Sequence, residues 1–325
     1  MSQSNSGLQK LQYFPASFFG MVMGIVGLSI ALINSDAMFA WSLVAGEAIL
    51  MFSVVLFAVL LASYLYKILR FKDAFWAEMR HPIKMNFIPT ISISLLLLSA
   101  AFWELEQVKT SFNLWLLGAS LQLVLTLWLL YNWIYHDFFK IEHSNPAWFI
   151  PIVGNIVVPI AGVQHVPEDI SWFFFAIGIV FWPLLKSVLL YRLIFHPPIP
   201  DKLMPTLFIF IAPPAVGCVS YMALNHGEVD AFARILYFFA LFFTLFLLFS
   251  INKFRKLNFA LSWWAYTFPL AAMAISSLVM GNALHSNGYL WIGALIMAGL
   301  AVMIVWLFYK TLIGVANNKI CSPDN

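Results

Sequence analysis

The chain has 325 residues, of which 62% are hydrophobic and 10% are charged, with a formal net charge of +3 and a mean hydropathy of +0.89. Soluble domains carry about 25% charged residues, so this composition excludes a soluble globular protein and indicates a polytopic, all-α membrane protein. The two cysteines, Cys218 and Cys321, are too few for a disulfide framework or a thiolate metal cluster.

Ten apolar runs follow one another along the chain, most of them near the roughly twenty residues that a spanning helix needs. We expect spans at 13–33, 41–66, 85–103, 112–134, 148–164, 170–193, 204–225, 231–251, 258–284 and 288–313. The fifth is short and holds two prolines, but omitting it would reverse the side of every later linker. Because the linkers are short, we expect one ten-helix domain over residues 1–325, with tails at about 1–12 and 314–325.

Basic residues are distributed unevenly over the linkers. If both termini are cytoplasmic, Lys109 and Arg234 are the only Lys or Arg residues assigned to the outside, where the linkers are acidic and include Glu104 and Glu106. Cytoplasmic linkers carry an excess of positive charge, so this bias favours cytoplasmic termini. The basic linker at 71–84 is compatible with a short amphipathic helix on the inner surface or with an ordinary loop.

Proline separates the odd-numbered spans from the even-numbered ones. The odd-numbered spans contain no Asp, Glu, Lys or Arg, and the even-numbered spans hold one proline, Pro183. The odd-numbered spans contain Pro15, Pro89, Pro151, Pro159, Pro213, Pro214 and Pro269. Because lipid cannot satisfy the backbone groups that proline frees, these spans must be covered by protein or line a water-filled cavity.

The regular recurrence of proline-containing spans predicts five helical hairpins. In this arrangement, kinked odd-numbered helices surround a central pore and straight even-numbered helices face lipid. The alternative is that the prolines are packed over by neighbouring helices, without a lumen. Pro15 and Pro89 lie near the inner ends of their spans, so bends at mid-membrane in the first and third spans would have to come from glycines or serines.

Small residues in the first and third spans are candidates for the pore wall. Gly20, Gly24 and Ser92 are examples, although glycines four residues apart usually mark close helix packing. A lumen lined by small, hydroxyl and aromatic groups, without fixed charge, favours weak and fast passage of ions over tight binding.

Phe268 is the candidate gate. It directly precedes Pro269 in the ninth span, roughly 15 Å into a hydrocarbon layer about 30 Å thick. A ring at this depth beside a helix bend either closes a lumen or is an aromatic side chain packed at a kink.

Four segments resemble those of a known family. They are HPIKMNF at 81–87, NPAWFIPIVGN at 145–155, IAPPAVG at 211–217 and WWAYTFPL at 263–270. All four are similar to segments of the tellurite-resistance and dicarboxylate transporter (TDT) family, which includes bacterial TehA proteins and plant guard-cell slow anion channels. Over about residues 13–315, the resemblance implies five hairpins around one pore, a homotrimer with a pore in each protomer and a phenylalanine plug that maps onto Phe268. It also implies a prokaryotic inner (plasma) membrane, and the short tails here argue against gating by kinases.

The leading functional hypothesis is a passive anion channel. A basic inner face would concentrate anions at the cytoplasmic entrance of the pore, and a neutral lumen would pass them without holding them. The alternative, which the same family suggests, is a carrier for small organic acids or oxyanions such as malate, sulfite or tellurite. The expected partners are small anions and the lipid bilayer. The sequence shows no catalytic motif, metal-ligand spacing or nucleotide-binding loop, so we expect no enzyme, cofactor, metal or nucleic acid.

Overall fold

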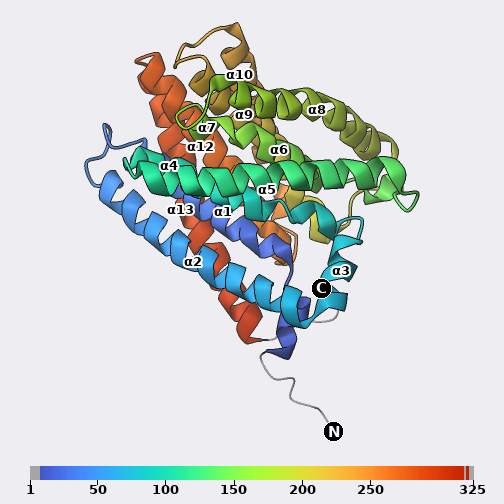
Figure 1. The fold of residues 1–325 in the computed structure, drawn as a ribbon. Coiled ribbons are helices and arrows are strands. Elements are labelled where there is room, and N and C mark those ends of the chain that lie inside the picture. The colour runs from blue at the N-terminus through green and yellow to red at the C-terminus, as the bar shows by residue number, and fades with distance from the viewer. Residues whose placement is uncertain (1–7, 318–319, 322–325) are drawn as a thin grey trace.

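The structure is a computed structural model that describes residues 8–317 and 320–321. These residues form α-helices and short 3-10 helices without a β-strand, and the molecule is a polytopic membrane protein. The even-numbered spans are α2 (Ser42–Arg70), α5 (Val108–Tyr135), α8 (Glu168–Phe195), α10 (Ala231–Phe249) and α13 (Asn287–Ala316), the long helices of Figure 1. Parts of both predicted tails, residues 1–7, 318–319 and 322–325, lie outside the described residues.

Each odd-numbered span is built from a 3-10 segment followed by an α-helical segment. The five are η2 (Ala16–Phe18) with α1 (Phe19–Ile33), η3 (Lys84–Phe87) with α4 (Thr90–Glu104), η5 (Pro146–Phe149) with α6 (Ile150–Val157) and α7 (Pro159–Gly162), η6 (Asp201–Ile211) with α9 (Ala212–Leu224), and η7 (Leu261–Tyr266) with α12 (Thr267–Ala283). The remaining short helices are η1 (Gln9–Tyr13), α3 (Lys72–Met79), η4 (Ile141–His143) and α11 (Ile251–Phe254).

Among the described residues, nine helices are long and apolar enough to cross a membrane, in agreement with nine of the ten expected spans. The fifth is a shorter apolar segment, Pro146–Gly162. At the end of the chain, α13 continues to Ala316, three residues beyond the predicted end of the tenth span. The C-terminal tail therefore begins later than the sequence pattern suggested.

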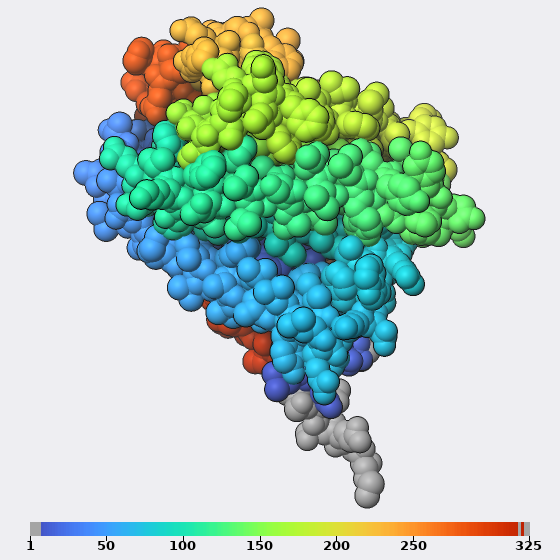
Figure 2. All heavy atoms as spheres, viewed as in Figure 1, coloured from blue at the N-terminus to red at the C-terminus, as the bar shows by residue number. Residues whose placement is uncertain are grey.

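Burial divides the spans into two classes. The four long odd-numbered spans bury 78–89% of the residues in their most apolar stretch, whereas the even-numbered spans bury 28–39%. The odd-numbered spans therefore form the core, and the even-numbered ones carry the exposed apolar surface. Side chains of α2, α5 and α8 make up much of the face seen in Figure 2.

Most prolines of the odd-numbered spans lie at the start of an α-helical segment, whereas Pro15 is the N-cap residue of the 3-10 helix η2. Pro89 is the N-cap residue of α4, and Pro269 is the third residue of α12. Four more lie in the first turns of α6, α7 and α9: Pro151 in α6, Pro159 in α7, and Pro213 with Pro214 in α9. The first turn of an α-helix tolerates proline because its N–H groups lack partners within that helix. These prolines thus mark the starts of α-helical segments.

Side chains of neighbouring helices donate hydrogen bonds to backbone carbonyl groups of the fifth span. Gln122 Nε2 on α5 donates to the Pro151 carbonyl at 2.7 Å, and Trp115 Nε1 donates to the Val158 carbonyl at 2.9 Å. The Ser220 hydroxyl on α9 donates to the Ile156 carbonyl. These donors join the interrupted fifth span to α5 and α9 by hydrogen bonds that lipid could not supply.

A buried ion pair attaches the surface helix α3 to the start of the first span. Lys67 Nζ at the end of α2 lies 2.5 Å from Glu78 Oε2 on α3, and these side chains are 3% and 5% exposed. The Ala16 N–H donates to Glu78 Oε1 at 2.8 Å, and Lys67 Nζ donates to the Phe14 carbonyl at 2.8 Å. The linker at 71–84 therefore contains a helix, and its carboxylate holds the chain just before α1.

The exposed turn at Glu106 offers a test of orientation. Glu106 lies between α4 and α5 at the end of the molecule opposite the basic linkers. In a variant lacking Cys218 and Cys321, we expect Glu106→Cys to react with a membrane-impermeant thiol reagent in intact cells, because the positive-inside bias places this turn outside. A cysteine at Lys253 is the matched control, which should react only after permeabilisation. The reverse pattern would contradict cytoplasmic termini.

Candidate permeation pathway

Two cavities lie one after the other between the odd-numbered spans. The proximal cavity, on the side where these spans begin, is lined from all five of them, for example by Gly20, Phe87, Ile150, Ile209, Trp264 and Phe268. The distal cavity is lined from the same spans farther along, for example by Ile30, Leu97, Ile160, Val216, Phe268 and Ala272. Each has a volume of about 50 Å³, room for a few water molecules.

A wider mouth follows the distal cavity. Its volume is about 500 Å³, and its wall includes Trp103, Glu104, Gln164, Glu168 and His226. Glu104 lines the distal cavity as well as the mouth, as do three apolar residues, Ile160, Val219 and Val279. The distal cavity and the mouth therefore adjoin and share part of their walls.

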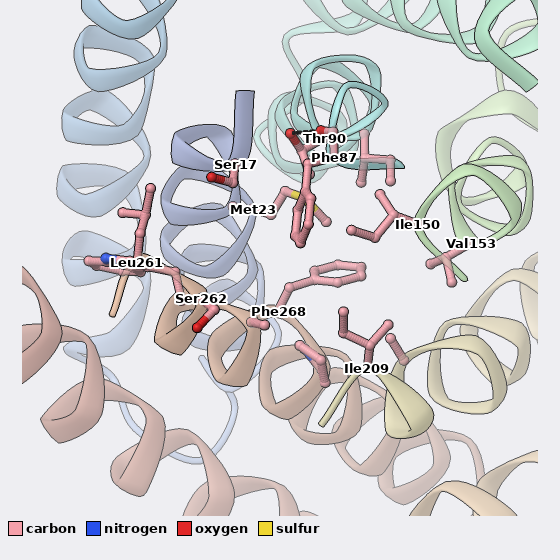
Figure 3. Close-up of a pocket in the computed structure, with 16 residues that line it drawn as sticks. Ser17, Met23, Phe87, Thr90, Ile150, Val153, Ile209, Leu261, Ser262 and Phe268 are labelled. Atoms are coloured by element: carbon pink, nitrogen blue, oxygen red, sulfur yellow. Dashed lines mark hydrogen bonds between the residues drawn. The ribbon is translucent and has the colours of Figure 1, made fainter. Parts of the chain in front are cut away.

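Phe268 separates the proximal cavity from the distal one. It is the only residue among those described that lines both cavities, and its side chain is 7% exposed. Its ring projects from α12 into the centre of the proximal cavity, with Phe87 and Ile209 on either side in the view of Figure 3. The Phe268 side chain is therefore shared by the walls of the two cavities.

The three residues predicted for the pore wall have different surroundings. Gly20 lines the proximal cavity, and a Cβ added there would meet nothing within 4 Å. At Gly24 a Cβ would lie 1.9 Å from Thr267 Oγ1, so this glycine permits close contact between α1 and α12 beside the gate candidate. Ser92 points away from the cavities, and its hydroxyl donates to Gln122 Oε1 at 2.7 Å. Of the three, Gly20 alone lines a cavity.

Of the six prolines predicted to kink the pore helices, one lines a cavity. Pro269 lines the proximal cavity next to Phe268. The other five lie outside the lining of the proximal cavity, the distal cavity and the mouth: Pro89, Pro151, Pro159, Pro213 and Pro214.

Two of the recognised motifs begin the 3-10 segments that lead to the proximal cavity. His81 Nδ1 in HPIKMNF accepts from the N–H groups of Ile83 and Lys84, both at 3.2 Å, just before η3. Burial, followed by the charge of Lys84, lowers the pKa of His81, which keeps the ring neutral and able to accept. Asn145 Oδ1 in NPAWF likewise accepts from the Ala147 N–H at 3.0 Å and caps η5. These polar residues thus fix the backbone at the proximal end.

A second histidine lies behind the wall of the mouth. The His165 ring packs edge-on against Trp103 with centroids 5.4 Å apart, and its Nε2 lies 2.8 Å from the Ser111 hydroxyl. Burial lowers the pKa of His165, so its uncharged form predominates at neutral pH. In the mouth itself, His226 Nε2 lies 3.7 Å from Glu168 Oε1.

Sequence reasoning missed two residues of the passage. Phe87 is the last residue of HPIKMNF, and its place in a recognised motif, inside the start of the predicted span 85–103, was the available signal. Glu104 was noted only as an acidic linker residue. Its position as the last residue of α4, directly after an apolar span, was the signal that it would reach the end of the pathway.

Comparison with known proteins identifies the family. A family model described as "SLAC1: Voltage-dependent anion channel" matches residues 13–312. The chain belongs to the SLAC1 family. The predicted resemblance is therefore confirmed, and the protein is a membrane protein of an anion-channel family, not an enzyme.

Three relatives illustrate the range of the family. An uncharacterized transporter of Methanocaldococcus jannaschii is 30% identical over 297 residues, which cover 84% of this chain and 85% of the relative. The S-type anion channel SLAH2 of Arabidopsis thaliana is 30% identical over 273 residues, covering 82% of this chain but 52% of that protein. The tellurite resistance protein TehA homolog of Haemophilus influenzae is 26% identical over 296 residues, covering 89% of each.

Proposed function

We propose that the chain is a passive anion channel that conducts small anions through a pore in each protomer, with Phe268 as the gate. The observation that carries this proposal is the position of the Phe268 ring between two cavities that the same five spans enclose. Membership of an anion-channel family supports the substrate class. The proximal cavity contains no Asp, Glu, Lys, Arg or His among its described lining residues, which suits weak and fast passage.

The architecture in this proposal is five hairpins around the pore. It is supported by the burial of the odd-numbered spans and by the extensive packing of the consecutive pairs α1–α2, α4–α5 and α12–α13. Consecutive antiparallel helices with short connections form such pairs. We extend the proposal to a homotrimer in a prokaryotic inner membrane with cytoplasmic termini, because of the similarity to the TehA homolog and the positive-inside bias.

The deciding experiment is a current measurement on purified protein in a planar bilayer with a chloride gradient. A channel predicts a current whose reversal potential approaches that of chloride and shifts when chloride is replaced by a larger anion. The Phe268→Ala variant should be measured beside the parent, because a closed gate would hide the current. Absence of anion current in both proteins, correctly inserted at equal density, would contradict the channel.

The second candidate function is a carrier for small organic acids or oxyanions such as malate, sulfite or tellurite. The observation that favours it is the Glu104 carboxylate in the passage, since coupled carriers use intramembrane carboxylates to hold a proton or cation. A carrier predicts saturable uptake into vesicles that responds to a proton or sodium gradient. Uptake that follows only the electrochemical gradient of the anion would favour the channel.

A further inference from the structure

We propose that the Glu104 carboxylate is the electrostatic barrier to anions in the distal half of the passage, so that flux increases when this carboxylate is neutralised. The inference rests on the proposed channel function. Its starting point is the distribution of charge along the passage. Among the described lining residues, the proximal cavity has no Asp, Glu, Lys, Arg or His, and Glu104 is the only charged residue of the distal cavity.

The other charged residues of the mouth do not cancel this carboxylate. Glu168 and His226 lie 3.7 Å apart and face each other, so a protonated His226 would compensate Glu168 first. Their side chains are 50% and 76% exposed, which lets solvent screen both. Glu104 is an exposed residue as well, but unlike Glu168 and His226 it also lines the narrow distal cavity.

The surroundings of Glu104 add negative potential. As the last residue of α4, it lies at the helix end where the macrodipole is negative. Partial desolvation by the surrounding protein, and then the like charge of Asp36 in the linker after α1, both disfavour the charged form of this carboxylate. No hydrogen bond or ion pair with its carboxylate is found within the part of the chain that the structure describes.

The neighbouring elements provide little compensation. Asn34 after α1, Gln164 after α7 and Val279 on α12 are uncharged residues in the same walls. His165 lies behind Trp103, and Lys109 at the start of α5 lies outside the cavity lining. An anion that passes from the distal cavity to the mouth therefore meets an uncompensated negative charge where the passage is still narrow.

Glu104→Gln tests this proposal because it keeps the size and polarity of the side chain and removes its charge. In the Phe268→Ala background, we expect it to raise chloride conductance roughly threefold or more at low salt, with a smaller effect near 1 M salt, where screening acts within about 3 Å. Glu168→Gln in the same background is the matched control. It removes an exposed carboxylate from the mouth, and we expect a clearly smaller increase.

The pH dependence provides an independent readout. Protonation removes the negative charge of a carboxyl group, so acidifying the bath on the mouth side from about pH 7 to about pH 5 should raise anion current. That increase should be larger with Glu104 present than in Glu104→Gln, because the other ionisable groups at the mouth, Glu168 and His226 with Asp36 and His165 nearby, are the same in both proteins.

The outcomes separate this inference from the proposed function. If Phe268→Ala conducts and Glu104→Gln leaves its conductance and pH response unchanged, the barrier assignment is wrong and the channel stands. If Glu104→Gln abolishes transport that a proton gradient had driven in the parent, the carboxylate serves coupling and the inference is overturned in favour of the carrier. If correctly inserted Phe268→Ala passes no anion at all, the channel and the inference both fail.

Discussion

Truncation of Phe268 to alanine is expected to raise the resting anion conductance roughly tenfold or more. The ring is the only side chain among the described residues that borders both the proximal and the distal cavity, so its removal should join them. Pro269 and the junction between η7 and α12 stay unchanged in this variant. The measurement is macroscopic current in bilayers or oocytes, normalised to the amount of protein at the membrane.

Graded and matched variants make the result specific to the gate. Phe268→Leu leaves intermediate bulk and should give intermediate conductance. Phe242→Ala removes the same ring from α10, where the side chain is 59% exposed on the outer surface, and should give no gain in current. If Phe268→Ala inserts and folds normally but conducts no more than the parent, Phe268 is not the gate.

The stability of these variants is informative as well. Truncation of a fully packed core phenylalanine commonly costs about 3–5 kcal/mol, because the lining of the new cavity loses its contacts. Phe268 already borders two cavities and so makes fewer packing contacts than a fully packed ring. We therefore expect its truncation to lower the free energy of unfolding by less than that range. Thermal unfolding in detergent, followed by size-exclusion chromatography, provides the comparison.

The sequence predicted the spans well because hydrophobicity and length alone determine whether a helix can cross a membrane. It did not reveal that the odd-numbered spans change from 3-10 to α-helix. A proline such as Pro269 is equally compatible with a kink in a continuous α-helix and with the first turn of a new one. The contacts that accompany these junctions come from other helices, as when Gln122 and Trp115 of α5 donate to the Pro151 and Val158 carbonyls, and such contacts between distant segments cannot be read from the local sequence.

The side of an inner helix that faces the passage was harder to predict. α1 is apolar around its whole circumference, and fourteen of its fifteen residues are buried, so no polar stripe distinguishes Gly20 from Gly24. Ser92 resembled a pore-lining hydroxyl, but its partner is Gln122 on an even-numbered helix that was expected only to face lipid. Phe268 was found because its position before a proline was combined with a family motif. Glu104 had no such marker.

Removal of either member of the buried Lys67–Glu78 pair is expected to destabilise the protein by about 3–5 kcal/mol, because the remaining charge would be buried without its partner. The two side chains are 3% and 5% exposed, so water cannot replace the lost contact. Glu78→Leu would also leave the Ala16 N–H without its acceptor at the start of the first span, one residue before Ser17 in the wall of the proximal cavity.

The double variant Lys67→Met/Glu78→Leu separates the energy of the pair from the cost of an orphaned charge. Replacing both charges by apolar groups of similar volume is often neutral or stabilising, so the double variant should be more stable than either single variant. Glu168→Gln is the exposed control, and its effect should be small because its partner His226 is 76% exposed. The double-mutant cycle compares the free energy of unfolding of the parent, Lys67→Met, Glu78→Leu and the double variant, measured by denaturant or thermal unfolding. Additive losses in the double variant would show that Lys67 and Glu78 act independently, and the attachment of α3 to the first span would then need another explanation.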